Sequence, residues 1–349
     1  LRTLGHHLLH LASSQPGWEA GRLNGTDFAL LACGEEDAAA VAQRMQVEID
    51  RAIAHAGEGE PLEVAFALGA CAFAPGTALK ALLAHTDGAL AGAEQDGARM
   101  IRIADPDRPP LPHTDLHGWR CAIEDAVLKS RMMLARFPVL STGGAVLHQE
   151  APVRLEMGGE WQSAGYFMPW AARLGLVSRI DAEVVRRALL DVEQEPSALG
   201  INISAESLCD AAFRNHLQTL LDSRPEAARK LWVEVPEYGV VQHPAEFREL
   251  CQMLKPLGCR IGIEHCGREL KRIGDLHDLG LDYIKVDASM VRSIDTEPGN
   301  QNVLRSLCML AHSIGVQVIA EGVSTAQEQA ALTRLGVDGV TGPGVQAQA

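Results

Sequence analysis

The sequence predicts an α/β protein in which an N-terminal α/β domain is followed by a (β/α)8 barrel that contains one antiparallel strand. Three observations predict this fold class. The chain has 349 residues, which is longer than a typical single domain. A proline-rich stretch interrupts it near residue 110, and the part that follows alternates short apolar segments with amphipathic helical segments.

Eight apolar segments of the C-terminal part have the length and composition of buried strands. Strands that alternate with helices of roughly 10–15 residues form βαβ units, and eight of them in one domain indicate a closed barrel. The short turn Ser141–Gly144 predicts a hairpin between the first two, so one strand should run antiparallel. The predicted strands are Arg136–Leu140, Val146–Leu155, Gly200–Ser204, Leu231–Val235, Arg260–Glu264, Tyr283–Val286, Val316–Ala320 and Gly339–Val340.

The N-terminal part, residues 1–104, has its own alternation of strand-like and helical segments. The stretch Ala104–Asp115 contains four prolines and shows no hydrophobic periodicity, which is typical of a linker. We therefore expect residues 105–117 to form a linker and residues 118–349 to form the second domain. The elements predicted before the linker are strands Phe28–Cys33, Leu62–Phe73 and Met100–Ile103 and helices Asp37–His55 and Ala78–Gly92.

Composition and charge exclude several classes of protein. The formal net charge of −14 argues against a nucleic-acid-binding protein, because such a protein presents a basic face to the phosphates. None of the eight cysteines forms a CxxC pair, so we expect reduced thiols. The sequence contains no apolar run of about 18 residues, so it predicts no membrane span. The chain opens directly on a helix-like pattern, LRTLGHHLLHLA, which suggests a piece of a larger protein.

Polar side chains stand at the ends of six consecutive predicted strands of the barrel. The carboxyl ends of barrel strands meet at one rim, where the chemistry of such folds takes place. Any one of these residues alone would be an ordinary surface residue, but together they indicate a site. Carboxylate and amide oxygens suit Mg²⁺, Mn²⁺ or Ca²⁺, and several of them suit a two-metal phosphoester hydrolase. The residues are Glu150, Asn202, Glu234, Glu264, Lys285 with Asp287, and Glu321.

Six short motifs link this rim to a known family. They are, in chain order, Glu150-Ala151-Pro152 with Arg154, Phe167-x-Pro169, Asn202-x-Ser204, Glu234-x-x-Glu237, Lys285-x-Asp287 and Ala320-Glu321-Gly322-Val323. In order and spacing they resemble the motifs of EAL domains, whose active members hydrolyse cyclic di-GMP with two divalent ions. The resemblance covers residues 118–349 and implies a barrel that contacts cyclic di-GMP.

The segment Arg22–Phe28, RLNGTDF, resembles the Arg-x-Gly-Gly-Asp-Glu-Phe signature of GGDEF domains. Asn24 replaces a glycine, Thr26 replaces the aspartate and Asp27 replaces the glutamate. The family needs that acidic pair for its metal and its chemistry, so cyclase activity is not expected. The family's inhibitory Arg-x-x-Asp has no counterpart at residues 15–18, and its first strand has none either. The resemblance therefore implies a degenerate and N-terminally incomplete GGDEF domain over residues 1–104.

The EAL resemblance breaks where active members carry Asp-Asp-Phe-Gly. Here the residues are Glu264-His265-Cys266-Gly267, and the loop that organises the metals in the family reads RELKR at Arg268–Arg272. A neutral imidazole cannot replace a carboxylate charge, and Glu264 moves its carboxylate one methylene outward, whereas metal–ligand distances tolerate only about 0.2 Å. We therefore expect no hydrolysis, no bound metal and no other cofactor. The remnants of metal ligands are Glu150, Asn202, Glu234 and Glu264.

Three functions remain open. The chain is a catalytically inactive receptor for cyclic di-GMP, a phosphodiesterase with weak residual activity, or an interaction scaffold that binds no nucleotide. The resemblance favours the receptor, because arginine suits phosphate recognition and because binding and turnover rest on partly different contacts. The residues expected to bind the ligand are Arg154, Pro169, Asn202, Asp287, Glu321 and Glu150. Trp161 and Trp170 are expected to be packing residues, and Trp170 lies near the proposed pocket.

Three segments indicate a narrower group within the family. Residues 273–295, 311–323 and 335–345 are similar to inner-membrane cyclic di-GMP receptors that control a periplasmic adhesin protease. This resemblance implies that the chain lies on the cytoplasmic side of a bacterial inner membrane and reaches membrane and periplasmic partners through segments absent from this sequence. It also implies that the ligand releases a closed arrangement and lets the EAL domain form a homodimer.

Overall fold

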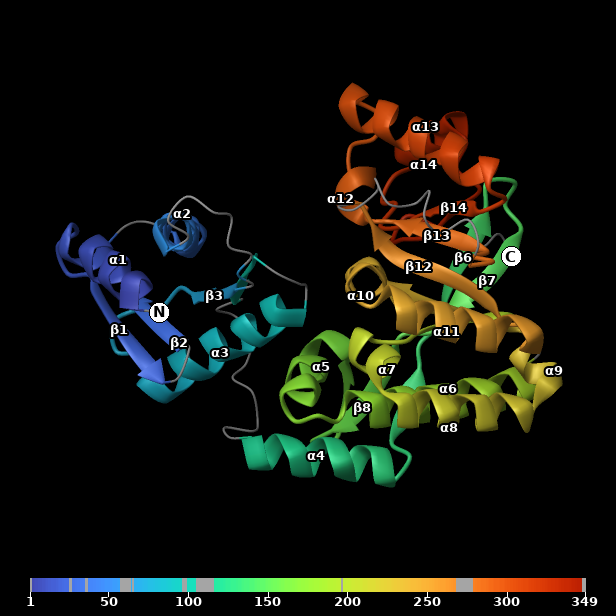
Figure 1. The fold of residues 1–349 in the computed structure, drawn as a ribbon, viewed down its shortest axis with the longest axis horizontal. Helices are drawn as coiled ribbons and strands as arrows, with labels where there is room; N and C mark the ends of the chain where they lie inside the picture. The colour runs from blue at the N-terminus through green and yellow to red at the C-terminus, as the bar shows by residue number, and fades with distance from the viewer. Residues whose placement is uncertain are drawn as a thin grey trace. The chain divides into compact units, whose positions relative to one another are not determined.

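The computed structural model describes residues 2–24, 27–34, 37–56, 64, 66–95, 99–104, 116–195, 197–267 and 279–346, and Figure 1 shows the fold. The chain forms two compact units, Leu1–Arg120 and Cys121–Ala349. The predicted linker lies outside the described residues except for Leu116 and His117, which begin helix α4 (Leu116–Leu128). Within the described residues, no helix combines the length and the apolar character needed to cross a membrane.

The N-terminal unit contains two separate two-stranded sheets. Strands β1 and β2 form an antiparallel hairpin, and the turn of this hairpin, Gly25 and Thr26, lies outside the described residues. Strands β3 and β4 pair in parallel. The elements of the unit are α1 (Arg2–Ser13), β1 (Glu19–Asn24), β2 (Asp27–Leu31), α2 (Ala38–Ala56), β3 (Ala67–Cys71), α3 (Leu79–Gln95) and β4 (Met100–Ala104). The five elements predicted here are found, with β3 shorter than the predicted strand Leu62–Phe73.

The C-terminal unit is a closed eight-stranded barrel, so the predicted fold class is confirmed. The strand order is β10-β11-β12-β13-β14-β15-β6-β7. Strand β6 runs antiparallel to both of its neighbours, as the hairpin at Ser141–Gly144 predicts. The barrel strands are β6 (Phe137–Ser141), β7 (Val146–Glu150), β10 (Leu199–Asn202), β11 (Leu231–Pro236), β12 (Arg260–Cys266), β13 (Tyr283–Val286), β14 (Gln317–Ala320) and β15 (Gly339–Val340).

The connections between parallel strands that the structure describes in full contain helices, because each crossover must return the chain to the other end of the barrel. Helix α14 shows how local sequence sets their bounds: a capping box of Thr325 and Glu328 begins it, and Gly336, with a left-handed φ of 93°, ends it. The helices after α4 are α5 (Ala164–Arg173), α6 (Val177–Gln194), α7 (Ala205–Cys209), α8 (Ala211–Asp222), α9 (Pro225–Ala228), α10 (Glu237–Gln242), α11 (Pro244–Leu254), the 3-10 helix η1 (Lys255–Leu257), α12 (Ala288–Val291), α13 (Pro298–Ser313) and α14 (Ala326–Leu335).

The prediction of a single strand over Val146–Leu155 is wrong, because this segment forms two strands in different sheets. Strand β7 ends at Glu150, and β8 joins an antiparallel sheet of three strands. Pro152 lies between β7 and β8 and has no backbone N–H to donate to a barrel neighbour, so the barrel pairing stops there. Arg154 therefore stands on the small sheet. The strands of the small sheet are β5 (Met132–Leu134), β8 (Val153–Met157) and β9 (Glu160–Ser163).

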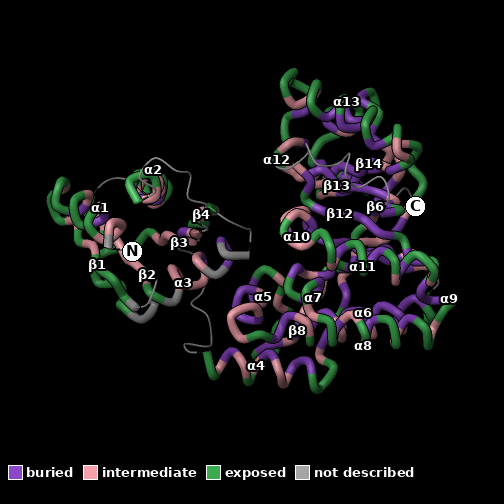
Figure 2. Tube along the Cα trace, in the orientation of Figure 1, coloured by how far each residue is buried: buried purple, intermediate pink, exposed green. Residues whose placement is uncertain are grey.

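Large side chains fill the interior of the barrel, and Figure 2 shows its strands coloured mainly as buried. Strands β11 and β13 are buried along their whole length, as expected for parallel strands covered on both faces. Gly262 in β12 leaves the space that a central tyrosine needs: a Cβ at this position would come within 2.3 Å of the Tyr283 ring. The central cluster consists of Val139, Trp232, Tyr283 and Ile319.

Replacing Gly262 by alanine should therefore destabilise the C-terminal unit by about 3 kcal/mol, because an added methyl group in a packed core pushes its neighbours out of their preferred rotamers. Gly165 in helix α5 offers a matched control, since a Cβ there would meet nothing within 4 Å. Gly165→Ala should be neutral or slightly stabilising. Differential scanning calorimetry of both variants measures the effect, and equal melting temperatures would contradict the prediction.

Candidate functional site

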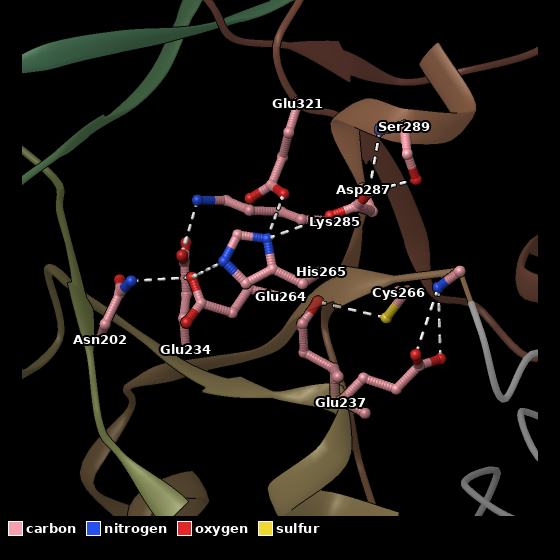
Figure 3. A network of polar contacts seen from close by, with 12 residues as sticks. Asn202, Glu234, Glu237, Glu264, His265, Cys266, Lys285, Asp287, Ser289 and Glu321 are labelled. Atoms are coloured by element: carbon pink, nitrogen blue, oxygen red, sulfur yellow. Dashed lines mark hydrogen bonds and ion pairs between the residues drawn. The ribbon is translucent and has the colours of Figure 1, made fainter. Parts of the chain in front are cut away.

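The carboxyl ends of the barrel strands bring the predicted polar residues together at one rim, as Figure 3 shows for most of them. The contacts form two groups. The lysine network consists of Glu150, Glu234 and Lys285. The histidine network consists of Asn202, Glu264, His265, Asp287 and Glu321.

Lys285 stands at the centre of the lysine network. Its side chain is 1% exposed, and its Nζ donates to Oε1 of Glu150 at 2.7 Å and to Oε2 of Glu234 at 2.6 Å. Burial alone would lower the pKa of Lys285, but the two carboxylates outweigh burial and raise it, so the ammonium stays charged. Burial alone would raise the pKa of Glu234, but the charge of Lys285 holds that pKa at about 2. The pair is therefore ionised inside the protein.

A β-bulge at Glu264 and His265 turns two consecutive side chains toward the rim. The pairing of β12 with β13 shifts between Ile263 and Cys266, and His265 has a φ of 55°, which lies in the left-handed region. Side chains of a regular strand alternate between its two faces, and a bulge interrupts this alternation. A left-handed conformation costs a residue with a side chain roughly 1–2 kcal/mol, so the contacts of His265 must offset this strain.

The imidazole of His265 lies among three carboxylates (Figure 3). Its Nδ1 is 3.0 Å from Oε2 of Glu321 and 3.6 Å from Oδ2 of Asp287, and its Nε2 is 3.8 Å from Oε2 of Glu264. The contact with Glu321, helped by the other carboxylates and opposed by burial, raises the pKa of His265 to about 10. The side chain is 59% exposed, so water screens part of this attraction. The charged imidazolium is nevertheless the favoured form at neutral pH.

Burial reduces the negative charge of the rim. Glu264 is buried and accepts a hydrogen bond from Nδ2 of Asn202 at 2.7 Å. Burial raises the pKa of Glu264 to about 7, although the charge of His265 acts in the opposite direction. Burial also raises the pKa of Glu150, against the influence of Lys285. At neutral pH the rim therefore carries less negative charge than its carboxyl groups would carry in water.

The four remnants of metal ligands do not fit a pair of divalent ions in this arrangement. Glu150 and Glu234 converge on the ammonium of Lys285, and Glu264 accepts from Asn202, so oxygens that would face cations already face donors. A different group, His265, Asp287 and Glu321, offers one ligand atom each within 4.8 Å of one another. An ion at that group would have to displace the proton of His265, because only a neutral imidazole coordinates a metal.

Arg154 and Pro169 belong to neither network. Arg154 stands between Met133 and Ser163 in the small sheet and is half-buried. Within the described ranges, its guanidinium has no hydrogen-bond or ion-pair partner. Pro169 is buried in the interior of helix α5. Ligand contacts by these two residues therefore stay predictions.

Of the two tryptophans expected to be packing residues, Trp170 is buried. Trp161 is 45% exposed and lies at the surface. Trp161 faces Glu156 of strand β8 across the small sheet. Its neighbour Gln162 pairs instead with Leu155, which is fully buried on the other face. The alternation of the strand thus places Trp161 on the solvent side.

Three residues that support the rim were missed by sequence analysis. Asp181 of helix α6 accepts from the backbone N–H and the hydroxyl of Ser204, and so fixes the turn after Asn202. Tyr283 donates its hydroxyl to Oε1 of Glu234 at 2.9 Å. His148 lies in β7 with Nε2 3.6 Å from the same oxygen. The signal for the last two was their position two residues before Lys285 and Glu150, which places them on the same face of their strands.

Replacing Lys285 by methionine should destabilise the C-terminal unit by about 3–5 kcal/mol, because the buried Glu234 and the partly buried Glu150 would lose their cation. Lys255 is the matched control, since its Nζ lies 2.9 Å from both carboxylate oxygens of Asp282 but is partly exposed. Lys255→Met should cost less than about 1 kcal/mol. Calorimetric unfolding compares the two variants, and similar losses would argue against a dominant role of the buried pair.

The stability of the protein should also depend on the titration of Asp181. Burial raises the pKa of this carboxyl to about 6, although its serine partners oppose the shift. The folded state therefore binds the proton more tightly than the unfolded chain, where the pKa is about 3.9. The stability that this proton contributes is present below about pH 4 and is lost as the pH rises through about 6, an amount of about 3 kcal/mol.

An Asp181→Asn variant lacks this titration but can still accept from Ser204 through its amide oxygen. Between pH 4 and pH 7, its free energy of unfolding should therefore rise by about 2 kcal/mol relative to that of the unmodified protein. Urea unfolding at a series of pH values measures this difference. A difference that does not change with pH would show that Asp181 ionises normally in the folded state.

Comparison with known proteins places this geometry in a family. Residues 120–347 match the family model described as EAL domain. The chain is 26% identical over 277 residues to the RNase E specificity factor CsrD of Escherichia coli K12, which covers 79% of this chain and 43% of the relative. It is 28% identical over 228 residues to the cyclic di-GMP phosphodiesterase PdeF of the same organism, which covers 63% of this chain and 30% of the relative. The chain thus spans less than half the length of these curated relatives.

Two solved structures extend the comparison. The Vibrio cholerae LapD S helix-GGDEF-EAL structure bound to c-di-GMP matches 98% of this chain and 82% of its own, with a TM-score of 0.78 and 20% identity. It shows the fold, including a GGDEF-like N-terminal unit. The Xanthomonas citri FimX EAL domain in complex with c-diGMP matches 65% of this chain and 91% of its own, with a TM-score of 0.61 and 25% identity. Because the family model covers most of the chain and every residue of the two networks, the chain belongs to the EAL domain family.

Proposed function

We propose that this chain is a catalytically inactive receptor that binds cyclic di-GMP at the rim of its EAL barrel. The observation that carries the proposal is the contrast between two kinds of charged residue. Lys285 and His265 are engaged by the carboxylates on which a two-metal centre would depend. The half-buried guanidinium of Arg154 has no such partner among the described residues and is therefore available to a phosphate.

The chemistry of the ligand suits the remaining groups. A cyclic dinucleotide presents phosphate oxygens, which match the donors of an arginine, and guanine N–H groups, which match carboxylate acceptors. Asp287 and Glu321 follow β13 and β14 at the rim and supply such acceptors. Asn202 adds an amide. Relatives with bound cyclic di-GMP, such as the FimX EAL domain, support this choice of ligand.

The same arrangement argues against hydrolysis. A two-metal mechanism needs ions to activate water and to stabilise both the attacking and the leaving oxygen. An ion could replace the ammonium of Lys285 between Glu150 and Glu234 only by breaking one buried and one partly buried hydrogen bond. Weak residual phosphodiesterase activity is the enzyme alternative, and the name of the relative PdeF supports it.

A scaffold that binds no nucleotide is the second alternative. The relative CsrD is named as an RNase E specificity factor and not as a phosphodiesterase. The rim of this chain is satisfied internally, so the barrel does not need a ligand to complete its contacts. A partner protein would then bind the surface of the barrel, and the rim would bind no ligand.

The finer features of the proposal concern the whole protein. We infer that the GGDEF-like unit is degenerate, because Thr26 and Asn24 stand in its signature. We also infer that the chain works on the cytoplasmic side of a bacterial inner membrane and that the EAL domain dimerises when the ligand binds. Both inferences, and the connection to a periplasmic partner, rest on the similarity of residues 273–295, 311–323 and 335–345 to membrane-bound receptors.

Isothermal titration with cyclic di-GMP tests the proposal. We expect a dissociation constant of about 1 μM or lower, which corresponds to about −8 kcal/mol, and we expect the same value in Mg²⁺ and in a chelator. Arg154→Ala should weaken binding by about tenfold or more, because one charge-assisted contact to a phosphate is lost. Arg179→Ala, which removes an exposed arginine 3.7 Å from Glu124, is the control and should bind normally.

The outcomes separate the three functions. An absence of heat at high ligand concentration favours the scaffold and rejects the receptor. Conversion of the ligand to linear dinucleotide in Mn²⁺, followed by chromatography, would show an enzyme. Normal binding by Arg154→Ala would place the phosphate contact elsewhere on the barrel.

A further inference from the structure

A histidine inside the barrel lies directly beneath the lysine network. His148 in strand β7 is 1% exposed and precedes Glu150 by two residues, so both side chains point toward the barrel axis. Its ring stacks on Trp232 with 4.1 Å between the ring centroids and 25° between the planes. Its Nε2 lies 3.6 Å from Oε1 of Glu234. The imidazole is thus held flat against one neighbour and directed at another.

Neither ring nitrogen of His148 has a hydrogen-bond partner within the described part of the chain. A buried polar group without a partner needs an explanation, because leaving it unpaired costs free energy. The polar group that the ring faces is the carboxylate of Glu234. Their separation is longer than a regular hydrogen bond, but a ring N–H placed there still directs its dipole at a buried anion in a medium of low dielectric.

Gly200 provides the space that this ring occupies. A Cβ on Gly200 would come within 2.9 Å of Cδ2 of His148 and 3.4 Å of Oε1 of Glu234. Glycine weakens a strand. In β10 the close approach of the His148 ring explains why a glycine stands at this position. Gly200 and His148 therefore form a size-matched pair beside Glu234.

We propose that His148 is a positioning residue which, together with Tyr283, orients Glu234 and thereby places the ammonium of Lys285 between Glu234 and Glu150. Oε1 of Glu234 accepts from the Tyr283 hydroxyl and faces His148, which leaves Oε2 for Lys285. If the carboxylate rotated, Lys285 would lose one of its two acceptors. The other possible role of His148 is to fill volume, and the two roles predict different results for substitutions of similar size.

The direct test observes Lys285 by ¹⁵N NMR of its ammonium group. A buried ammonium held by two carboxylates exchanges slowly with water and gives a resolved signal, which the Lys285→Met variant assigns by its loss. His148→Gln keeps an N–H group at a similar reach and should keep the signal. His148→Leu keeps a similar volume without an N–H group and should lose or shift it. Equal spectra for the glutamine and leucine variants would overturn the proposal.

A double variant keeps the test decisive if His148→Leu does not fold. His148→Ala together with Gly200→Ala refills part of the vacated space from the neighbouring strand β10. We expect this double variant to regain thermal stability relative to His148→Ala alone but not the ammonium signal of Lys285. Recovery of both would show that the ring only fills volume.

A second readout rests on the proposed function. If Lys285 shapes the rim on which cyclic di-GMP sits, His148→Leu should weaken ligand binding by about tenfold, the effect of one lost buried polar contact, and His148→Gln should not. No binding by the unmodified protein would reject the receptor and leave the NMR result valid. Equal affinities of the two variants beside a changed ammonium signal would limit the role of His148 to the orientation of Lys285.

Discussion

The buried contact of Lys285 with Glu150 and Glu234 is the interaction on which the rim of the barrel depends. It joins β13 to β7 and β11, which are separated from it by 135 and 51 residues in the sequence. Taking three charged groups out of water costs several kcal/mol each, and only good geometry with further hydrogen bonds offsets this cost. The short Nζ–O distances and the hydroxyl of Tyr283 supply both. The contact therefore fixes the positions of three strand ends, and with them the frame of the site.

The histidine network follows from the same constraint. Lys285 is engaged by Glu150 and Glu234, and the bulge at His265 brings a second cation beside the carboxylates of Asp287 and Glu321. The strain of a left-handed histidine is tolerated because its imidazolium satisfies carboxylates that would otherwise repel one another. The carboxylates of the rim thus contact two side-chain cations, Lys285 and His265. The turns beside the rim are held by Asp181 and by Glu237, which accepts from the backbone of Gly267.

The rim residues could be predicted from sequence because the ends of parallel strands converge wherever the strands are recognised. Glu150, Asn202 and Glu234 needed no more than that. Tyr283 and His148 could also have been found, since each precedes a rim residue by two positions in a strand. His265 could not, because its direction depends on a bulge that no spacing reveals. Pro152 was visible in the sequence, and its missing N–H explains why the apolar run from Val146 to Leu155 divides between two sheets. The exposure of Trp161 could not be predicted, because hydrophobic character alone does not tell which face of an edge strand is covered.

A rim whose carboxylates pair with side-chain cations of the same chain differs from a rim whose carboxylates bind metal ions from solution. The positive charge of Lys285 is held by its two carboxylate partners. An anionic ligand that approaches this rim meets carboxylates that are already paired with cations. Its attraction to the protein must therefore come from a cation that is not paired with a carboxylate. Arg154 satisfies this condition on the neighbouring sheet. Under the proposed function, the residue that recognises the phosphate is not one of the residues that metal-dependent hydrolysis would use. Loss of hydrolysis therefore does not entail loss of ligand binding.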